Sequence, residues 1–171
     1  MAATDIREDL NMALRVGIGY DIHARAPGRR LVLGGVTFET DWGLEGHSDA
    51  DVLSHAIGDA LLGAVGLGDI GRHFPPSDAR WKDASSIDLL RLIRALLDGR
   101  GAAIVNVDST LVAMEPHIAP HRDTMCARIA QGLRLGYDRV SVKATTNESL
   151  DALGRGEGIA AWAVAMVDVR D

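Results

Sequence analysis

Residues 159–169, near the C-terminus, constrain the fold most. They read IAAWAVAMVDV and carry apolar side chains at both odd and even positions. Successive side chains of a strand point to opposite faces of a sheet, so both faces of this strand need apolar cover. A central strand between two layers of helices would have that cover. If all helices lie on one face, a second subunit must cover the other, and the stretch then indicates an oligomer.

Strand and helix patterns alternate along the rest of the chain. The expected strands are residues 15–20, 31–33, 36–40, 103–114, 139–145 and 159–169. The expected helices are residues 50–65, 85–97 and 120–135, with loops at 41–51, 69–84 and 154–158. Helices that alternate with strands after a first hairpin predict an α/β (α+β) fold. We expect one domain with a mixed four- to five-stranded sheet and its helices on one face.

Length and composition bound the class of protein. The chain has 171 residues, 47% of them hydrophobic and 25% charged, as in a single globular domain. We expect residues 1–14 to be a flexible extension and residues 15–171 to be the domain. The net charge of −6 argues against a nucleic-acid partner. A phosphate-bearing substrate would then need a metal ion or backbone N–H groups to bind.

Targeting signals are not evident in the sequence. No stretch approaches the roughly 18 consecutive apolar residues that span a bilayer, and the first residues are too charged for a signal peptide. Cys126 is the single cysteine, so an internal disulfide is impossible, and we expect it to be a small buried hydrophobe. These features predict a cytoplasmic protein with no membrane partner.

The motif GYDIHA, residues 19–24, ends the first expected strand. Residues two apart in a strand share a face, so Asp21 and His23 project together. A carboxylate and an imidazole on one face make two-thirds of a metal site. The alternative is a hydrogen bond between Asp21 and His23 at a strand end, and a third ligand decides between the two.

The segment HSDADVLSH, residues 47–55, supplies the third ligand. On the expected helix Asp51, His55 and Asp59 share one face, and Asp51 suits a helix cap. His55 has no such structural role and is the ligand candidate. A carboxylate and two imidazoles with an open position are typical of catalytic zinc, and also of a non-haem iron oxygenase. His47 and Ser48 lie where they can reach a metal-bound ligand.

Four motifs in order give the chain a family resemblance. GYDIHA, HSDADVLSHAIGDALLGAVGLGDIGRHFPPSD, KATTNESL and GRGEGIA are similar to the motifs of the 2-C-methyl-D-erythritol 2,4-cyclodiphosphate synthase family, over about residues 16–169. The resemblance implies cyclisation of 4-diphosphocytidyl-2-C-methyl-D-erythritol 2-phosphate with release of CMP, in the non-mevalonate isoprenoid pathway. It implies Zn²⁺ on Asp21, His23 and His55, and Mg²⁺ or Mn²⁺ between the substrate's α- and β-phosphates. It also implies a homotrimer that packs the uncovered sheet face and places the active sites between subunits.

The resemblance assigns further residues to the site. His47 and Thr146 are implied to stabilise the transition state, with Ser48 beside the 2-phosphate and Asp21 and His23 also against the substrate. The implied substrate contacts are Asp69, Ile70 and Gly71 for ribose; Phe74, Pro75, Pro76, Ser77 and Asp78 for methylerythritol; Ala113, Met114, Glu115, Pro116, His117, Ile118 and Ala119 for cytosine; and Thr145, Thr146, Asn147 and Glu148 for diphosphate. Ala152 is implied to line a central cavity and Arg155 to lie near the trimer axis.

Two positions depart from the family pattern. His117 stands where many members carry Lys or Arg, so less phosphate charge is neutralised there. Ala152 stands where an aromatic residue is common, so we expect a wider or less aromatic central cavity for any isoprenoid ligand. The TTNES segment, residues 145–149, has a plain helix N-cap as its alternative reading.

Three rival functions use the same residues. A metal-dependent hydrolase predicts bulk water at the metal and a general base beside it. A non-haem iron oxygenase predicts dependence on Fe²⁺ and O₂. A non-catalytic trimeric binding protein predicts a purely structural metal, against which an open three-ligand site argues.

Overall fold

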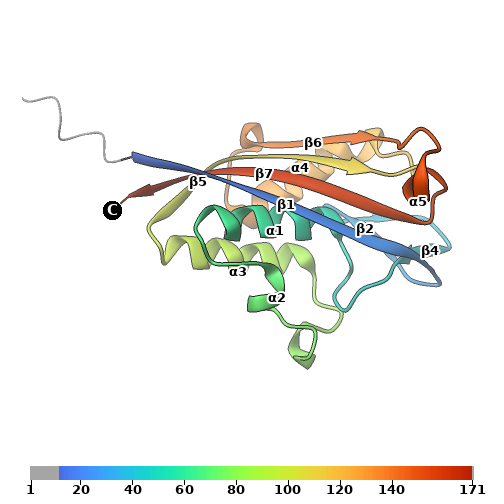
Figure 1. Ribbon diagram of the computed structural model, residues 1–171, viewed down its shortest axis with the longest axis horizontal. Coiled ribbons are helices and arrows are strands. Elements are labelled where there is room, and N and C mark those ends of the chain that lie inside the picture. Colours follow the sequence, from blue (N-terminus) through green and yellow to red (C-terminus); the bar gives the residue numbers. More distant parts are fainter. Residues whose placement is uncertain (1–11, 171) are drawn as a thin grey trace, which may run out of the picture.

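The C-terminal strand occupies the centre of the main sheet. In the computed structural model, which describes residues 12–170, β7 (Gly158–Arg170) is the third strand of five in the order β4-β1-β7-β5-β6. It pairs antiparallel with β1 on one side and with β5 on the other, while β5 and β6 run parallel. The sheet is mixed, and the helices α1, α3 and α4 form a layer on one of its faces (Figure 1). The predicted fold class is therefore confirmed.

The remaining elements follow one another along the chain. The strands are β1 (Met12–Pro27), β2 (Leu31–Leu33), β3 (Val36–Phe38), β4 (Trp42–Leu44), β5 (Ala102–Val112) and β6 (Val140–Thr145). The α-helices are α1 (Val52–Ala64), α2 (Ile70–His73), α3 (Ser86–Asp98), α4 (Arg122–Leu133) and α5 (Asp151–Gly154), and the 3₁₀ turns are η1 (Ala79–Trp81), η2 (Ala119–His121) and η3 (Tyr137–Arg139). Strands β2 and β3 form the predicted hairpin as a separate two-stranded sheet.

The two faces of the sheet differ sharply in cover. On the helix side β7 presents Ala161, Ala163 and Ala165, all at most 1% exposed. On the opposite side β1 and β7 expose large apolar side chains, and Trp162 is still 40% accessible. The exposed set on that face is Leu14, Val16, Ile18, Tyr20, Ile22, Trp162 and Val164. Within residues 12–170 the helices therefore cover one face only, as predicted.

Two glycines bring α1 unusually close to β1. A Cβ atom on Gly17 would lie 1.9 Å from the carbonyl oxygen of Ala60, and one on Gly19 would lie 1.9 Å from that of Ala56. No side chain fits in that space, so the helix backbone rests directly on the strand. His55 is adjacent to Ala56, and Asp21 and His23 follow Gly19 on the same face of β1. This close contact determines how near the three residues come.

Several boundaries differ from the prediction. The first strand extends to Pro27, because its pairing with β7 and then with β4 continues beyond the apolar run that marks it in the sequence. The expected loop 41–51 contains β4, which consists of only three residues. The expected loop 69–84 contains α2 and η1, and α5 ends within the expected loop 154–158. These elements are too short for hydrophobic periodicity to mark them.

The ends of the chain bear on two other expectations. Of the predicted flexible extension, residues 1–11 lie outside the described residues, whereas Met12–Leu14 belong to β1 and pair with the end of β7. Cys126 is buried, as expected. None of the helices within residues 12–170 has the length and hydropathy needed to cross a membrane.

Candidate metal centre

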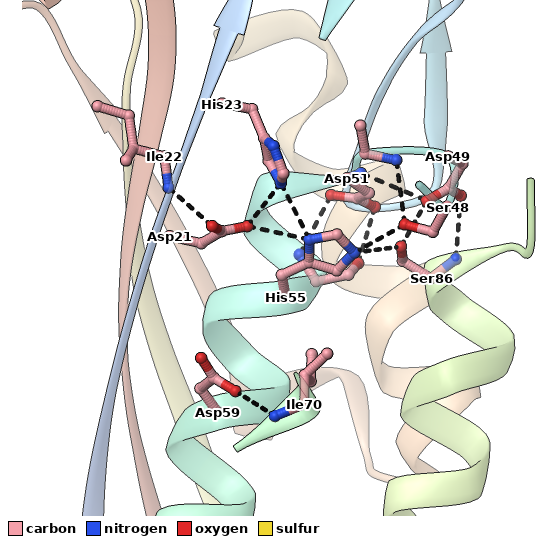
Figure 2. A network of polar contacts seen from close by, with 12 residues as sticks. Asp21, Ile22, His23, Ser48, Asp49, Asp51, His55, Asp59, Ile70 and Ser86 are labelled. Carbon is pink, nitrogen blue, oxygen red and sulfur yellow. Dashed lines mark hydrogen bonds and ion pairs between the residues drawn. The ribbon is translucent and has the colours of Figure 1, made fainter. Parts of the chain in front are cut away.

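Three donor atoms from β1 and α1 converge on one point. Asp21 Oδ2 lies 2.9 Å from His23 Nε2 and 2.9 Å from His55 Nδ1, and the two ring nitrogens are 3.2 Å apart (Figure 2). All three side chains are partly buried. The predicted set of Asp21, His23 and His55 is therefore confirmed as a cluster, and within residues 12–170 it is the group of three with metal-ligand geometry.

The start of α1 is fixed by a carboxylate that does not join this cluster. Asp51 is fully buried and is the N-cap of α1, where it accepts hydrogen bonds from Ser54 N at 3.1 Å and Ser54 Oγ at 2.7 Å. It also accepts from the backbone N–H groups of Gly34 at 2.8 Å and Gly35 at 2.7 Å. The predicted capping role is confirmed. Asp51 thus holds the helix against the β2–β3 turn and so places His55.

The predicted acidic helix face is only partly correct. Asp59, one turn beyond His55, accepts a hydrogen bond from Ile70 N at 2.8 Å and serves to hold α2 (Figure 2). Helical spacing alone does not separate a ligand from a residue that holds a neighbouring segment.

The cluster favours positive charge between its members. Burial alone would raise the pKa of Asp21, but hydrogen bonds and charge from His23 and His55 outweigh it and hold that pKa well below its usual range. Burial acts to lower the pKa of His55, and here the hydrogen bond and charge of Asp21 outweigh it, so the pKa is raised. A site that stabilises a carboxylate and attracts a proton to an imidazole also attracts a divalent cation.

The donor set fits a zinc ion. Tetrahedral Zn²⁺ with bonds of about 2.0–2.1 Å places its ligands roughly 3.3 Å apart, close to the observed 2.9–3.2 Å. One carboxylate and two imidazoles leave a fourth position for substrate, as in catalytic sites. The second nitrogen of His55, Nε2, lies 3.0 Å from Ser48 Oγ and 3.0 Å from Ser86 Oγ. These two contacts fix the ring at the nitrogen that does not face the cluster.

Of the predicted pair His47 and Ser48, Ser48 lies beside the cluster. Ser48 is buried and its Oγ contacts His55, while the backbone carbonyl of Ser48 accepts a hydrogen bond from Arg29 at 3.1 Å. The Nε2 atom of His47 is buried without a hydrogen-bond partner among the described residues. Ser48 therefore contacts the cluster directly, whereas no contact among the described residues places His47 there, and the role of His47 stays a prediction.

The segment predicted to contact ribose and methylerythritol follows α1. Asp69 caps α2 and accepts from Arg72 N at 2.9 Å, Ile70 N is bonded to Asp59, and Gly71 is exposed within α2. In the next stretch Phe74 is buried against Trp81, with ring centroids 5.0 Å apart. Pro75, Pro76 and Ser77 lead to Asp78, which caps η1 and pairs with Arg80 at 2.6 Å.

A second group of predicted residues surrounds a cavity elsewhere in the chain. The cavity has a volume of about 630 Å³ and is open to the surface. Its lining is Ala113, Met114, Glu115, Pro116, His117, Ile118, Ala119, Arg122, Lys143, Ala144, Thr145 and Thr146. The predicted cytosine segment and both threonines are thus brought together, but none of the three metal-cluster residues lines this cavity.

The cavity contains two cations that were not predicted as site residues. Arg122 opens α4, and Lys143 precedes the threonines on β6, where it pairs with Asp108. Lys143 stands at the head of the KATT motif, so the motif already contained a signal for it. Nothing in the sequence near Arg122 marks it, because only the fold brings the start of α4 to the end of β6.

The remaining predicted residues lie beyond the cavity. Glu148 accepts from Thr146 Oγ1 at 2.9 Å, and Asn147 Nδ2 donates to Asp151 at 2.9 Å. The N-cap of α5 is Leu150, so the alternative of a cap within TTNES is not what the structure has. Ala152 is exposed on α5, and Arg155 pairs with Glu157 at 2.6 Å beside a cavity of about 280 Å³.

Comparison with known proteins places the chain among named relatives. Residues 14–168 match the YgbB family. The chain is 58% identical to 2-C-methyl-D-erythritol 2,4-cyclodiphosphate synthase of Paraburkholderia phymatum, over 91% of this chain and 98% of the relative. It is 56% identical to the bifunctional enzyme IspD/IspF of an Anaeromyxobacter species, over 94% of this chain but only 42% of that longer protein.

A solved structure agrees with these sequence matches. The structure described as IspF of Plasmodium falciparum in complex with CDP superimposes with a TM-score of 0.81 at 32% identity, over 93% of this chain and 98% of that chain. The relatives are enzymes, and the alternatives of a hydrolase or a non-catalytic metal-binding trimer are not favoured by them.

Proposed function

The chain belongs to the YgbB family, and we propose that it carries out the reaction of its 2-C-methyl-D-erythritol 2,4-cyclodiphosphate synthase relatives. The substrate is 4-diphosphocytidyl-2-C-methyl-D-erythritol 2-phosphate. An oxygen of the 2-phosphate bonds to the β-phosphorus, and the bond from that phosphorus to the oxygen bridging to the α-phosphate breaks. CMP leaves with the bridging oxygen and no water is consumed. The enzyme is therefore a phosphorus–oxygen lyase, and we place it in the cytoplasm with the isoprenoid precursor pathway.

Asp21, His23 and His55 hold the catalytic metal in this proposal. When bound, Zn²⁺ at these donors and Mg²⁺ or Mn²⁺ at the diphosphate supply Lewis-acid neutralisation of phosphate charge. The chain carries a net charge of −6 and as a whole repels an anionic substrate. A metal ion on these three residues would supply positive charge where the phosphates bind.

His47, Ser48 and Thr146 position the reacting phosphates. The hydroxyl of Ser48 lies next to the metal cluster, and His47 is its chain neighbour with an Nε2 unpaired among the described residues, which supports a role for the pair in orienting the 2-phosphate. Thr146 lines the cavity of about 630 Å³, and its hydroxyl, which donates to Glu148 in the free chain, turns to the diphosphate when substrate binds. Alignment of the attacking oxygen with the β-phosphorus lowers the barrier by up to about 7–11 kcal/mol in favourable intramolecular reactions.

The nucleotide is held by the other predicted contacts. The backbone of residues 113–119 binds cytosine, the segment 69–71 binds ribose, residues 74–78 border the methylerythritol unit, and residues 145–148 bind diphosphate. The cavity of about 630 Å³ is large enough for the base and its neighbouring groups. Lys143 and Arg122 at this cavity supply positive charge near His117, which stands where many family members carry Lys or Arg.

We propose a homotrimer that joins these two groups of residues. Two observations support it. The metal cluster and the nucleotide cavity share no lining residue among the described residues of one chain, which supports a site in which the cavity of one subunit meets the metal cluster of its neighbour. The sheet face with Val16, Ile18 and Trp162 exposes a row of apolar side chains that association would bury. Ala152 and Arg155 would lie near the threefold axis.

The convergence of Asp21, His23 and His55 carries the functional proposal. Phosphorus NMR of the protein with the diphosphocytidyl substrate and Mg²⁺, with and without a chelator, tests it. We expect a cyclic diphosphate and CMP, with both signals lost on chelation. A linear diphosphate would mean that water attacks in place of the 2-phosphate, and it would favour a hydrolase.

A further inference from the structure

A polar chain extends from His55 away from the metal cluster. The Nε2 atom of His55 lies 3.0 Å from the hydroxyl of Ser86, the first residue of α3 (Figure 2). Ser86 is completely buried, so its hydroxyl must find all its partners within the protein. Its other partner is Asp49, whose two carboxylate oxygens accept from the Ser86 hydroxyl and, at 3.0 Å, from the Ser86 backbone N–H.

Asp49 also anchors the segment that carries His47 and Ser48. Its backbone N–H donates to the carbonyl of Ala84 at 3.0 Å, and Asp83 N–H donates to the carbonyl of His47 at 2.9 Å. These backbone bonds and the carboxylate together fasten residues 47–49 onto the start of α3. One residue thus connects the phosphate-orienting segment to a metal ligand.

Counting protons fixes the direction of each hydrogen bond. A serine hydroxyl has one proton, and that of Ser86 is donated to the carboxylate of Asp49, which can only accept while ionised. The oxygen of Ser86 can then only accept from His55, so Nε2 must carry the proton. A neutral imidazole with its proton on Nε2 presents a lone pair at Nδ1, which is the atom that faces Asp21 and His23.

We propose that Asp49 and Ser86 are positioning residues that keep the proton of His55 on Nε2 and so hold Nδ1 ready to bind the metal. The hydroxyl of Ser48 lies 3.0 Å from the same Nε2 and is a second acceptor, so loss of Ser86 weakens the arrangement without abolishing it. Outer hydrogen-bond partners of metal-bound histidines affect metal affinity by about 10–100-fold. This inference rests on the proposed metal site.

The two residues make different predictions when they are replaced. Ser86→Ala removes the acceptor, and we expect zinc affinity to fall by about tenfold. Asp49→Asn places an NH₂ donor against the Ser86 hydroxyl, which frees the Ser86 proton to donate to Nε2 and moves the His55 proton to Nδ1. We expect this substitution to lower zinc affinity by up to about 100-fold. The double variant has no Ser86 hydroxyl to donate to Nε2 of His55. Its zinc affinity should therefore return to that of Ser86→Ala alone.

Ser54→Ala is the matched control. Ser54 is as buried as Ser86, and its hydroxyl also donates to an aspartate, Asp51, at 2.7 Å. It precedes His55 in the chain, but no hydrogen bond joins its hydroxyl to the His55 ring. The substitution removes one buried hydroxyl from the same region, so it reports the cost to folding alone. Zinc affinity of the full-length protein would be measured by competition with a chromophoric chelator, and ligand geometry by the visible absorption of the Co²⁺-loaded form.

The outcomes separate the proposed positioning role of Asp49 and Ser86 from the metal site itself. The expected result is weakened zinc binding and an altered Co²⁺ spectrum for Ser86→Ala and Asp49→Asn, with neither change in Ser54→Ala. If Ser86→Ala and Asp49→Asn keep the zinc affinity and the Co²⁺ spectrum of the wild type, the positioning role of Asp49 and Ser86 is overturned. Equal losses in all three variants would also overturn it, because they would reflect folding only. Absence of zinc binding in the unsubstituted chain would instead contradict the proposed metal site.

Discussion

Asp21, His23 and His55 are held within one chain by a packed helix–strand contact, whereas Thr145, Thr146 and Glu148 lie exposed where β6 ends. The first region has its partners already in place, with donor atoms 2.9–3.2 Å apart and a hydrogen-bonded network behind them (Figure 2). The second region forms the wall of an open cavity. The contrast teaches that the metal half of the site is preorganised by folding, while the nucleotide half is left open, to be completed by a neighbouring subunit and by substrate in the proposed trimer.

The largest effect should come from removing a ligand of the preorganised half. His55→Ala deletes one of three donors, and we expect zinc content to fall from about one ion per chain to nearly none, with complete loss of cyclisation. Metal analysis after gel filtration checks this. The control is His121→Ala, since His121 packs on Phe38 with ring centroids 4.6 Å apart and lies outside the cluster. Full zinc occupancy in His55→Ala would refute the ligand assignment.

The exposed half should lose activity without losing metal. Thr146→Ala removes one donor near the diphosphate, and we expect turnover to fall by about 10²–10³-fold, as when one transition-state donor is deleted. Zinc content should stay unchanged, because Thr146 does not line the metal cluster. Thr37→Ala, an exposed threonine on β3, is the control. A matching loss of zinc in Thr146→Ala would mean that the two halves are not built separately.

The helix–strand contact should be intolerant of a single methyl group. A Cβ on Gly19 would lie 1.9 Å from the carbonyl oxygen of Ala56, so Gly19→Ala must push α1 away from β1. We expect a loss of about 3 kcal/mol in unfolding free energy and weaker zinc binding. Gly63→Ala is the control, since a Cβ there meets nothing within 4 Å and the helix should gain about 0.5–1 kcal/mol. Denaturant unfolding with metal titration measures both, and equal stabilities of the two variants would contradict the close contact.

Lowering the pH should weaken zinc binding at Asp21, His23 and His55 gradually. Asp21 raises the pKa of His55 in the metal-free chain, so a proton competes with zinc at Nδ1. Zinc affinity should therefore fall as the pH drops through that raised pKa, by about tenfold per pH unit for one competing proton.

The stability of the metal-free chain should change with pH in the opposite direction. The His55 contribution to its stability is fully present below the ordinary imidazole pKa and is lost as the pH rises through the raised value. Chelator competition and denaturant unfolding across pH check the two signs.

The sequence predicts the metal half better than its surroundings. Asp21 and His23 follow from the period of two in a strand, and His55 stands out because no structural role accounts for it. The role of Asp51 as a cap was also predictable from its place at the helix start. The contact of Asp49 with Ser86 was not, because the two are 37 residues apart and each suits a loop or a helix start.

The nucleotide half shows why resemblance was needed. The backbone of residues 113–119 carries no side-chain pattern that indicates a base, and Arg122 reaches the cavity only through the packing of α4. The short β4 and α5 also escaped prediction, since three or four residues are too few to show a period. The family resemblance identified residues 113–119, whereas Arg122, β4 and α5 are found only in the structure.

Mixing two inactive variants tests most directly whether the halves belong to different subunits. His55→Ala has an intact nucleotide half, and Thr146→Ala has an intact metal half. After subunit exchange in equal amounts, roughly one quarter of the sites in a shared-site trimer would combine both intact halves. We predict recovery of about that fraction of wild-type cyclisation, in mixed trimers verified by native mass spectrometry. Mixed trimers that stay as inactive as either variant alone would contradict the account.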